Sequence, residues 1–183
     1  MKKEIYLFSG LGADERVFKN LIFEGYSPIF ISWIIPLKNE KIEHYAKRLL
    51  PQIKQKNPTI IGLSFGGMMA VEIAKQIPTN KLILISSAKT KNEIPFYFRF
   101  LGNFKIHKLL PTSVLKSSNF VTNWFFGVIT KQEKILLKEI LQDTNPIFLK
   151  WAIDKIVNWK NVKTFNNMHH IHGDNDKILP SQF

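Results

Sequence analysis

The sequence contains no cysteine among its 183 residues. Disulfide bonds, thiolate metal sites and a cysteine nucleophile are therefore excluded. Histidine is also scarce, because the chain has only five, and none is spaced from carboxylates in the way that zinc ligands are. We expect neither a bound metal nor a cofactor.

Arginine is even rarer than histidine, since the chain has only Arg16, Arg48 and Arg99. The formal net charge of +12 therefore comes mainly from lysines, which are scattered singly along the chain. A strongly positive chain first suggests nucleic acid or an acidic membrane surface as its partner. Recognition of nucleic acid favours clustered arginine side chains, because a guanidinium group binds bases and phosphates through two hydrogen bonds. The composition predicts no nucleic-acid partner and indicates a bias towards lysine.

Long hydrophobic runs are absent as well. No stretch approaches the roughly 18 uncharged apolar residues of a membrane span. The first 18 residues superficially resemble a signal peptide, but Glu4 interrupts them and "ADER" stands where a cleavage site belongs. With 45% hydrophobic residues, the chain is long enough for one globular domain over residues 1–183. We expect a soluble cytoplasmic protein.

Apolar runs and helical patterns alternate through the first half of the chain. The runs are continuous, which is typical of parallel strands that are covered on both faces. Alternation of this kind predicts the α/β class, with a mostly parallel sheet of about five strands flanked by helices. The expected strands cover 4–10, 27–33, 58–63, 81–87 and 168–173, and the expected helices cover 14–22, 42–53 and 65–77.

The alternation stops between the fourth and fifth expected strands. Residues 88–160 contain no convincing strand and are rich in aromatic residues. We expect a helical insertion that lies over the sheet as a cap within the single domain. The alternative is that these aromatic side chains only pack a core, as scattered phenylalanines usually do.

One short stretch between a strand and a helix has the spacing of a catalytic serine motif. Residues 62–66 read "GLSFG" and fit the pattern G-x-S-x-G. A strand that turns directly into a helix holds its central residue, here Ser64, in a strained conformation with the hydroxyl exposed. Glycines at 62 and 66 lack the Cβ atoms that would collide in so sharp a turn. The motif predicts Ser64 as a nucleophile, with the Phe65 amide aimed at an oxyanion.

This strand, motif and helix resemble the nucleophile elbow of the α/β-hydrolase fold family. Two further stretches agree, "FSGLGADERVF" (8–18) and "IHGDNDKILP" (171–180), and the three motifs follow the family's order. The resemblance implies that Leu11 supplies a second oxyanion amide and that Asp176 is the triad acid, with Asp174 as its rival. It also implies the strand order 2-1-3-4-5.

The resemblance further implies a serine hydrolase that cleaves a small, apolar carboxylic ester or thioester by acyl transfer to Ser64. The family places its cap where residues 88–160 lie, over the nucleophile. Candidates for lining an apolar pocket there are the aromatic residues Phe96, Phe98, Trp124, Phe125 and Phe126. The acyl chain, the leaving group and the oligomeric state stay open.

The catalytic histidine of the family has no counterpart in this sequence. In the family it follows the acid after one more strand, but here only seven residues follow Asp176. His107, in the insertion, is a remote substitute. We expect a chain truncated before the catalytic histidine, without the family's last strand and helix, and with impaired activity. The fifth strand should then be an uncovered edge, which predicts low solubility or a covering partner.

Two other functions remain open for the same fold. One keeps the site but changes its chemistry, since the family also contains acyltransferases, lyases and haloperoxidases. The other is a non-catalytic domain that binds a small apolar ligand or a protein partner. The missing histidine favours the non-catalytic function, and the intact serine motif with Asp176 favours an enzyme.

Overall fold

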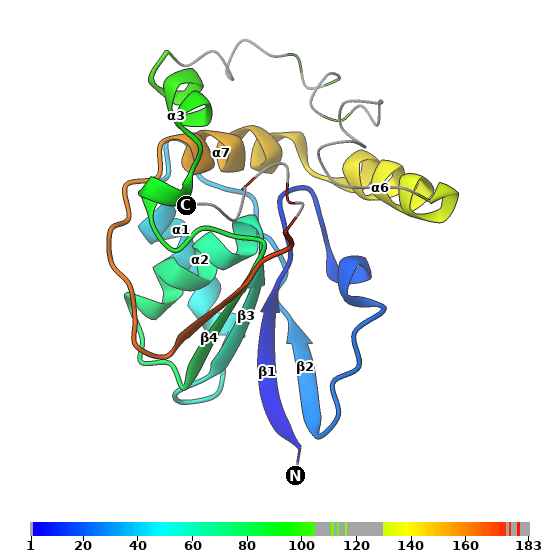
Figure 1. The fold of residues 1–183 in the computed structure, drawn as a ribbon, viewed down its shortest axis with the longest axis vertical. Coiled ribbons are helices and arrows are strands. Elements are labelled where there is room, and N and C mark those ends of the chain that lie inside the picture. The colour runs from blue at the N-terminus through cyan, green and yellow to red at the C-terminus, as the bar shows by residue number, and fades with distance from the viewer. Residues whose placement is uncertain are drawn as a thin grey trace.

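The centre of the fold is a five-stranded sheet in which every pair of neighbouring strands is parallel (Figure 1). The computed structural model describes residues 2–104, 111, 113, 116, 130–174, 176 and 179. The strands are β1 (Lys3–Phe8), β2 (Tyr26–Phe30), β3 (Thr59–Leu63), β4 (Lys81–Ile85) and β5 (Met168–Ile171). Their spatial order is β2-β1-β3-β4-β5, which confirms the predicted class and strand order.

Two helices cover one face of this sheet, α1 (Ile42–Leu49) and α2 (Phe65–Ala74). The side chains on this face belong to alternate strand residues, because successive residues of a strand point to opposite faces. They form the main hydrophobic core together with apolar residues of both helices. Its fully buried members include Tyr6, Phe8, Ile60, Leu82, Leu84, Tyr45, Leu49 and Met69.

The opposite face is covered only in part by the described residues. Ile5 and Leu7 of β1 pack there against Phe18 in a second, smaller core cluster. Further along the sheet Ile83 is half-buried, and Ile171 of β5 is 57% exposed. The prediction that continuous apolar runs are covered on both faces therefore holds for the first face and fails for the outer half of the second. β5 lies at the edge of the sheet, as expected.

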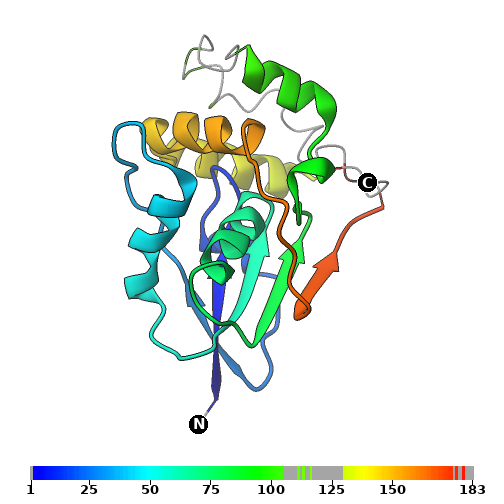
Figure 2. The ribbon, with the colours of Figure 1, turned by 90° about the vertical axis from the view of Figure 1, so that its left-hand side faces the viewer.

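Helices that follow β4 lie over the carboxyl ends of the strands (Figures 1 and 2). They are α3 (Phe96–Asn103), α6 (Lys131–Asp143) and α7 (Pro146–Val157). Thr130 and Glu133 form a reciprocal capping box at the start of α6, and the Asn145 side chain caps α7. Residues Trp124, Phe125, Phe126 and His107 lie outside the described part of the chain.

The predicted helices are shorter in the structure. The helix expected over 14–22 is a single 3-10 turn over Glu15–Phe18, which begins where the Asp14 side chain accepts a hydrogen bond from the Arg16 amide. α1 ends at Leu49 and continues as a 3-10 turn over Leu50–Gln52, since Pro51 has no amide hydrogen to donate. The helix expected over 65–77 ends at Ala74.

Candidate active site

Ser64 connects the end of β3 directly to the start of α2. Its backbone has φ of 52° and ψ of −119°, a conformation that residues with a side chain rarely adopt. Such strain persists only where the surroundings enforce it, and it is concentrated at functional sites. The strain expected from the sequence motif is therefore present at Ser64 itself.

Three glycines around Ser64 allow the backbone to pack this closely. A Cβ atom on Gly62 would collide with the backbone of Gly66 and Gly67. One on Gly66 would collide with the carbonyl oxygens of Phe8 and Ser9, at the end of β1. The sequence motif explained Gly62 and Gly66. The third, Gly67, was missed, and it is required because a Cβ there would strike the side chain of Ser87.

The loop after β4 holds the Ser64 backbone from the other side. The Ser64 amide donates to the carbonyl of Ile85 over 2.8 Å. The Ser87 hydroxyl donates to the Ser64 carbonyl over 2.6 Å, and so does the amide of Gly67 over 2.9 Å. Ser86 also has a positive φ, of 45°. The sequence gave no signal for Ser86 and Ser87 beyond their place at the end of a predicted strand.

The loop after β1 lies against Ser64. A Cβ atom built on Gly10 would lie 3.5 Å from the Ser64 Cβ, so Leu11 follows a residue in contact range of the serine. The Leu11 amide makes no hydrogen bond to any residue that the structure describes. Phe65 is the first residue of α2, where helix amides have no intrahelical partner. Phe65 and the residue before Leu11 therefore lie beside Ser64, and neither the Leu11 amide nor the Phe65 amide has a hydrogen-bond partner among the described residues.

Ser9 fixes the shape of this loop. Its hydroxyl donates to the carbonyl of Ala13 over 2.7 Å and accepts from the indole nitrogen of Trp33 over 2.9 Å. The Ala13 amide in turn donates to the carbonyl of Gly10. The loop that carries Leu11 is thereby closed on itself and tied to the chain after β2.

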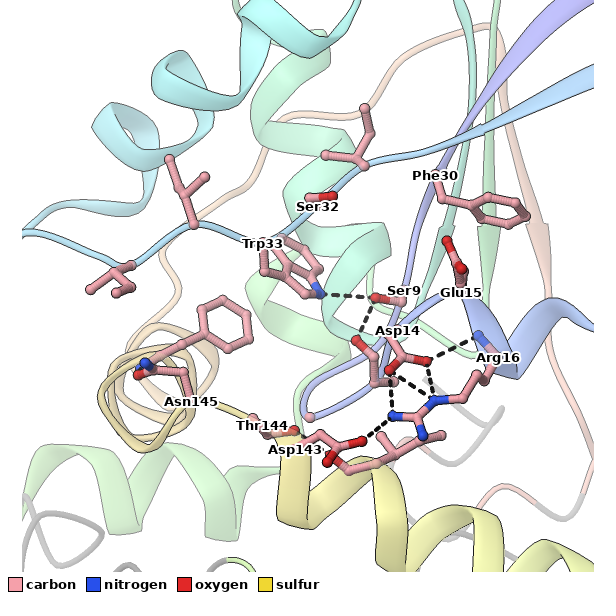
Figure 3. A pocket seen from close by; sticks show the side chains of 17 residues that line it. Ser9, Asp14, Glu15, Arg16, Phe30, Ser32, Trp33, Asp143, Thr144 and Asn145 are labelled. Atoms are coloured by element: carbon pink, nitrogen blue, oxygen red, sulfur yellow. Dashed lines mark hydrogen bonds and ion pairs between the residues drawn. The ribbon is translucent and has the colours of Figure 1, made fainter.

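A cavity of about 470 Å³ lies beside this loop (Figure 3). Its walls are the loop itself, residues 30–35 and the junction of α6 with α7. Trp33 and Phe148 stack in its interior with ring centres 5.1 Å apart. Ser64 does not line this cavity. We therefore do not assign it as the site of attack on a substrate.

Arg16 joins the loop to α6 at the edge of this cavity (Figure 3). Its guanidinium donates to both carboxylate oxygens of Asp14 over 2.6–3.0 Å, and to Asp143 at the end of α6 over 2.7 Å. Hydrogen bonding to Arg16 holds the pKa of Asp14 below its ordinary value. The loop with Leu11 and the helices above the sheet are thus linked by an ion pair.

Asp176 lies beyond the end of β5 and contacts a histidine. Its Oδ2 lies 3.2 Å from Nε2 of His172, and its Oδ1 accepts from the Leu179 amide over 2.9 Å. Nδ1 of His172 lies 3.1 Å from Nε2 of His170, which lies 2.8 Å from the carbonyl of Ser87. A hydrogen on Nε2 of His170 is then shared between the Ser87 carbonyl and Nδ1 of His172, which accepts it, and a hydrogen on Nε2 of His172 faces Asp176 and the Leu179 carbonyl.

Burial lowers the pKa of His170, outweighing the Ser87 carbonyl that favours its charged form. A neutral His170 is consistent with the tautomers that the contacts require. Through Ser87, which bonds to Ser64, the chain of side chains from Asp176 reaches the backbone of the serine. The rival acid Asp174 is exposed in the turn after β5.

No described histidine is hydrogen-bonded to the Ser64 hydroxyl. His172 and His170 bond to each other and to the groups just named. His44 is exposed on α1, and His169 is exposed on β5. The structure therefore places Phe65 and Gly10, which precedes Leu11, beside Ser64, and Asp176 in contact with His172.

Other kinds of site were sought over the same residues. Within the described ranges, no three histidine and acidic side chains are grouped so as to hold a metal ion. None of the described helices is long and apolar enough to cross a membrane.

Comparison with known proteins gives matches by structure. No protein-family model matches the chain, and a search of curated protein sequences finds no match. A hydrolase from Pseudomonas aeruginosa superposes with a TM-score of 0.75 at 13% identity, covering 98% of this chain and 75% of that one. An esterase from Exiguobacterium antarcticum gives 0.69 at 19% identity, covering 99% and 77%.

A bromoperoxidase from Bacillus anthracis also matches, with a TM-score of 0.64 at 17% identity, covering 98% of this chain and 76% of that one. Identities this low establish the fold and leave the reaction open. The strand order, the helix placement and these neighbours agree. The chain therefore has the α/β-hydrolase fold.

Proposed function

We propose that this protein is a serine hydrolase that transfers an acyl group from a carboxylic ester or thioester to Ser64. The observation that carries this proposal is the positive φ of Ser64 at the junction of β3 and α2. A serine that served only to make a turn would gain nothing from such strain. The esterase and hydrolase among the structural neighbours support the same reaction type.

The proposed reaction follows from the groups around Ser64. Its Oγ attacks the acyl carbon, a C–O bond forms, and the carbonyl oxygen becomes an oxyanion. The amides of Leu11 and Phe65 are suited to bind that oxyanion, because neither is occupied by a described partner. The bond to the alcohol or thiol leaving group then breaks, and water later releases the acyl group.

Attack by the Ser64 hydroxyl requires a general base. Ser64 must lose a proton to a base within hydrogen-bond distance, and no described histidine occupies that position. Asp176, proposed as the triad acid, is bonded to His172. Removal of a triad base lowers kcat by about 10⁴ to 10⁶. We therefore propose that the activity of this chain is impaired.

The substrate is proposed to be a small apolar molecule, bound in the cytoplasm beneath residues 88–160 acting as a cap. Of the aromatic candidates in this segment, Phe98 packs partly buried against the main core, whereas Phe96 is 73% exposed. Phe98 is therefore the better candidate for a pocket wall.

Hydrolysis of p-nitrophenyl acetate and of an acetyl thioester tests this function. We expect slow turnover by the wild-type chain and none above background by Ser64→Ala. Ser27→Ala, an exposed serine on β2, serves as the control and should retain wild-type turnover. Equal turnover by the wild type and Ser64→Ala would contradict the proposal. If the wild type turns over substrate at ordinary enzyme rates and Ser64→Ala abolishes this turnover, the proposed role of Ser64 stands and only the proposed impairment of activity is contradicted.

A non-catalytic binding domain is the second candidate. It is favoured because no described histidine is hydrogen-bonded to the Ser64 hydroxyl, so the described residues provide no histidine base to activate it. Acyl transfer to an acceptor other than water, or lyase chemistry, would use the same serine site. Product analysis on any substrate that acylates Ser64 separates these reactions from hydrolysis.

A further inference from the structure

A second cavity, of about 620 Å³, shares no lining residue with the cavity beside the loop that carries Leu11. It is bounded by the start of α1, the second half of α2, and residues 158–163 after α7. Glu72 and Lys75 contribute from α2, and Trp159 is buried against them. None of its lining residues belongs to the site at Ser64.

Lysine is strongly concentrated around this cavity. The chain has 23 lysines in 183 residues, so about one or two would be expected among twelve lining residues. Five are found, which shows that lysines scattered singly in the sequence meet in the fold. They are Lys41, Lys75, Lys155, Lys160 and Lys163.

Only part of this positive charge is neutralised. The buried carboxylate of Glu72 accepts from Lys75 over 2.7–2.9 Å and from the Trp159 indole over 2.8 Å, so it is fully engaged. Lys41 and Lys160 form no ion pair with any residue that the structure describes. Their ammonium groups remain available to a ligand.

Two further lysines are positioned by contacts around the cavity. Lys155 bonds to Asp154 over 3.0 Å and lies over the Trp151 ring. Lys163 lies over the ring of Phe165, 5.0 Å from its centre. These contacts position the ammonium groups of Lys155 and Lys163. Of these contacts, only the one between Lys155 and Asp154 is with an anion.

The start of α1 adds backbone donors to the same cavity. Lys41 is the N-cap of α1 and gives no side-chain cap, so the first amides of the helix lack that partner. Ile42 and Glu43, the first two helical residues, line the cavity. The positive end of the helix dipole therefore reinforces the lysines. Glu43 is the second lining carboxylate, and it is exposed.

We propose that this cavity binds a small polyanion that carries more than one phosphate group. Lysine binds phosphate as a point charge, and several such charges are spread around one hollow. The lysines come from the start of α1, from α7 and from residues 158–163, so a ligand with more than one phosphate group can engage several of them together. The site is independent of the proposed chemistry at Ser64.

Isothermal titration calorimetry with inorganic pyrophosphate at constant ionic strength tests this site. The cavity variant is the double substitution Lys41→Gln and Lys160→Gln. The matched control is Lys19→Gln and Lys138→Gln, which removes the same charge from exposed lysines that do not line the cavity. Circular dichroism verifies that both variants are folded.

We expect the wild-type chain to bind one pyrophosphate with a Kd of about 1 mM or lower. The cavity variant should bind at least about tenfold more weakly, and the control within about twofold of wild type. Equal weakening in the two variants would show a response to net charge alone and overturn the proposal. Absence of binding by the wild type would overturn it as well. Ser64→Ala should bind like the wild type.

Discussion

The hydroxyl of Ser87 donates a 2.6 Å hydrogen bond to the carbonyl oxygen of Ser64. This bond joins the loop after β4 to the strained turn between β3 and α2. The Ser87 carbonyl also accepts from His170, so one residue connects the turn with the histidine pair at the end of β5. The conformation of Ser64 is therefore supported directly from the loop after β4 and, through Ser87, from β5.

Substitution Ser87→Ala should destabilise the protein by about 1–2 kcal/mol, because it removes a buried hydrogen-bond donor from the Ser64 carbonyl. Chemical denaturation of the wild type and the variant measures this difference. Ser27→Ala, on the exposed edge of β2, is the control and should change stability by less than about 0.5 kcal/mol. Equal stability of all three proteins would contradict a supporting role for Ser87.

Substitution Gly66→Ala should destabilise the protein by more than about 3 kcal/mol or prevent folding, since its Cβ would collide with the carbonyl oxygens of Phe8 and Ser9. Gly173→Ala is the matched control, because a Cβ there meets no atom within 4 Å. Thermal unfolding followed by circular dichroism compares the two. A Gly66→Ala protein as stable as Gly173→Ala would contradict the close packing of the turn.

Substitution Asp143→Asn should lower the unfolding free energy by about 0.2–1 kcal/mol, because the ion pair with Arg16 is partly exposed to solvent. The effect should shrink in concentrated salt, which screens exposed charges. Glu139→Gln is the control, since Glu139 approaches Arg16 only to 4.0 Å. Denaturation at low and high salt tests both expectations. An identical effect of the two substitutions would contradict the link between α6 and the loop.

The lowered pKa of His170 predicts a loss of stability in mild acid. The unfolded chain takes up a proton near the ordinary value of 6.5, whereas folded His170 takes one up only at lower pH. Unfolding is therefore favoured as pH falls below about 6.5, and full stability is present above it.

Denaturation at about pH 7.5 and about pH 5.5 tests this prediction. His170→Gln retains a donor for the Ser87 carbonyl but cannot titrate, so its stability should change less between the two values than that of the wild type. His44→Gln, at an exposed position on α1, should behave like the wild type. If the stability of His170→Gln changes as much between the two pH values as that of the wild type, the lowered pKa of His170 is contradicted.

The sheet could be predicted from the sequence because each strand is a short apolar run between clear turn signals. The turn at Ser64 could be predicted for a similar reason, since "GLSFG" between a strand and a helix has one favoured geometry. The helix predicted over residues 14–22 was wrong. Their apolar positions resemble a helical stripe, but the Asp14 cap and Arg16 ion pair form a single 3-10 turn.

Contacts between distant segments could not be predicted in this way. No local pattern shows that Ser87 reaches Ser64, or that Arg16 reaches Asp143 across 127 residues. The lysine cavity is a further case, because its members come from three segments. The exposure of Ile171 on β5 agrees with the expectation of an uncovered edge strand, whereas the apolar runs alone do not reveal which face is covered.

The account rests most directly on Ser64 as a nucleophile in a formed oxyanion site. Reaction of the folded chain with a fluorophosphonate probe, followed by intact mass measurement, tests this claim. We predict slow addition of one probe to the wild type and none to Ser64→Ala. Absence of labelling on the folded wild type, or labelling that survives Ser64→Ala, would contradict it.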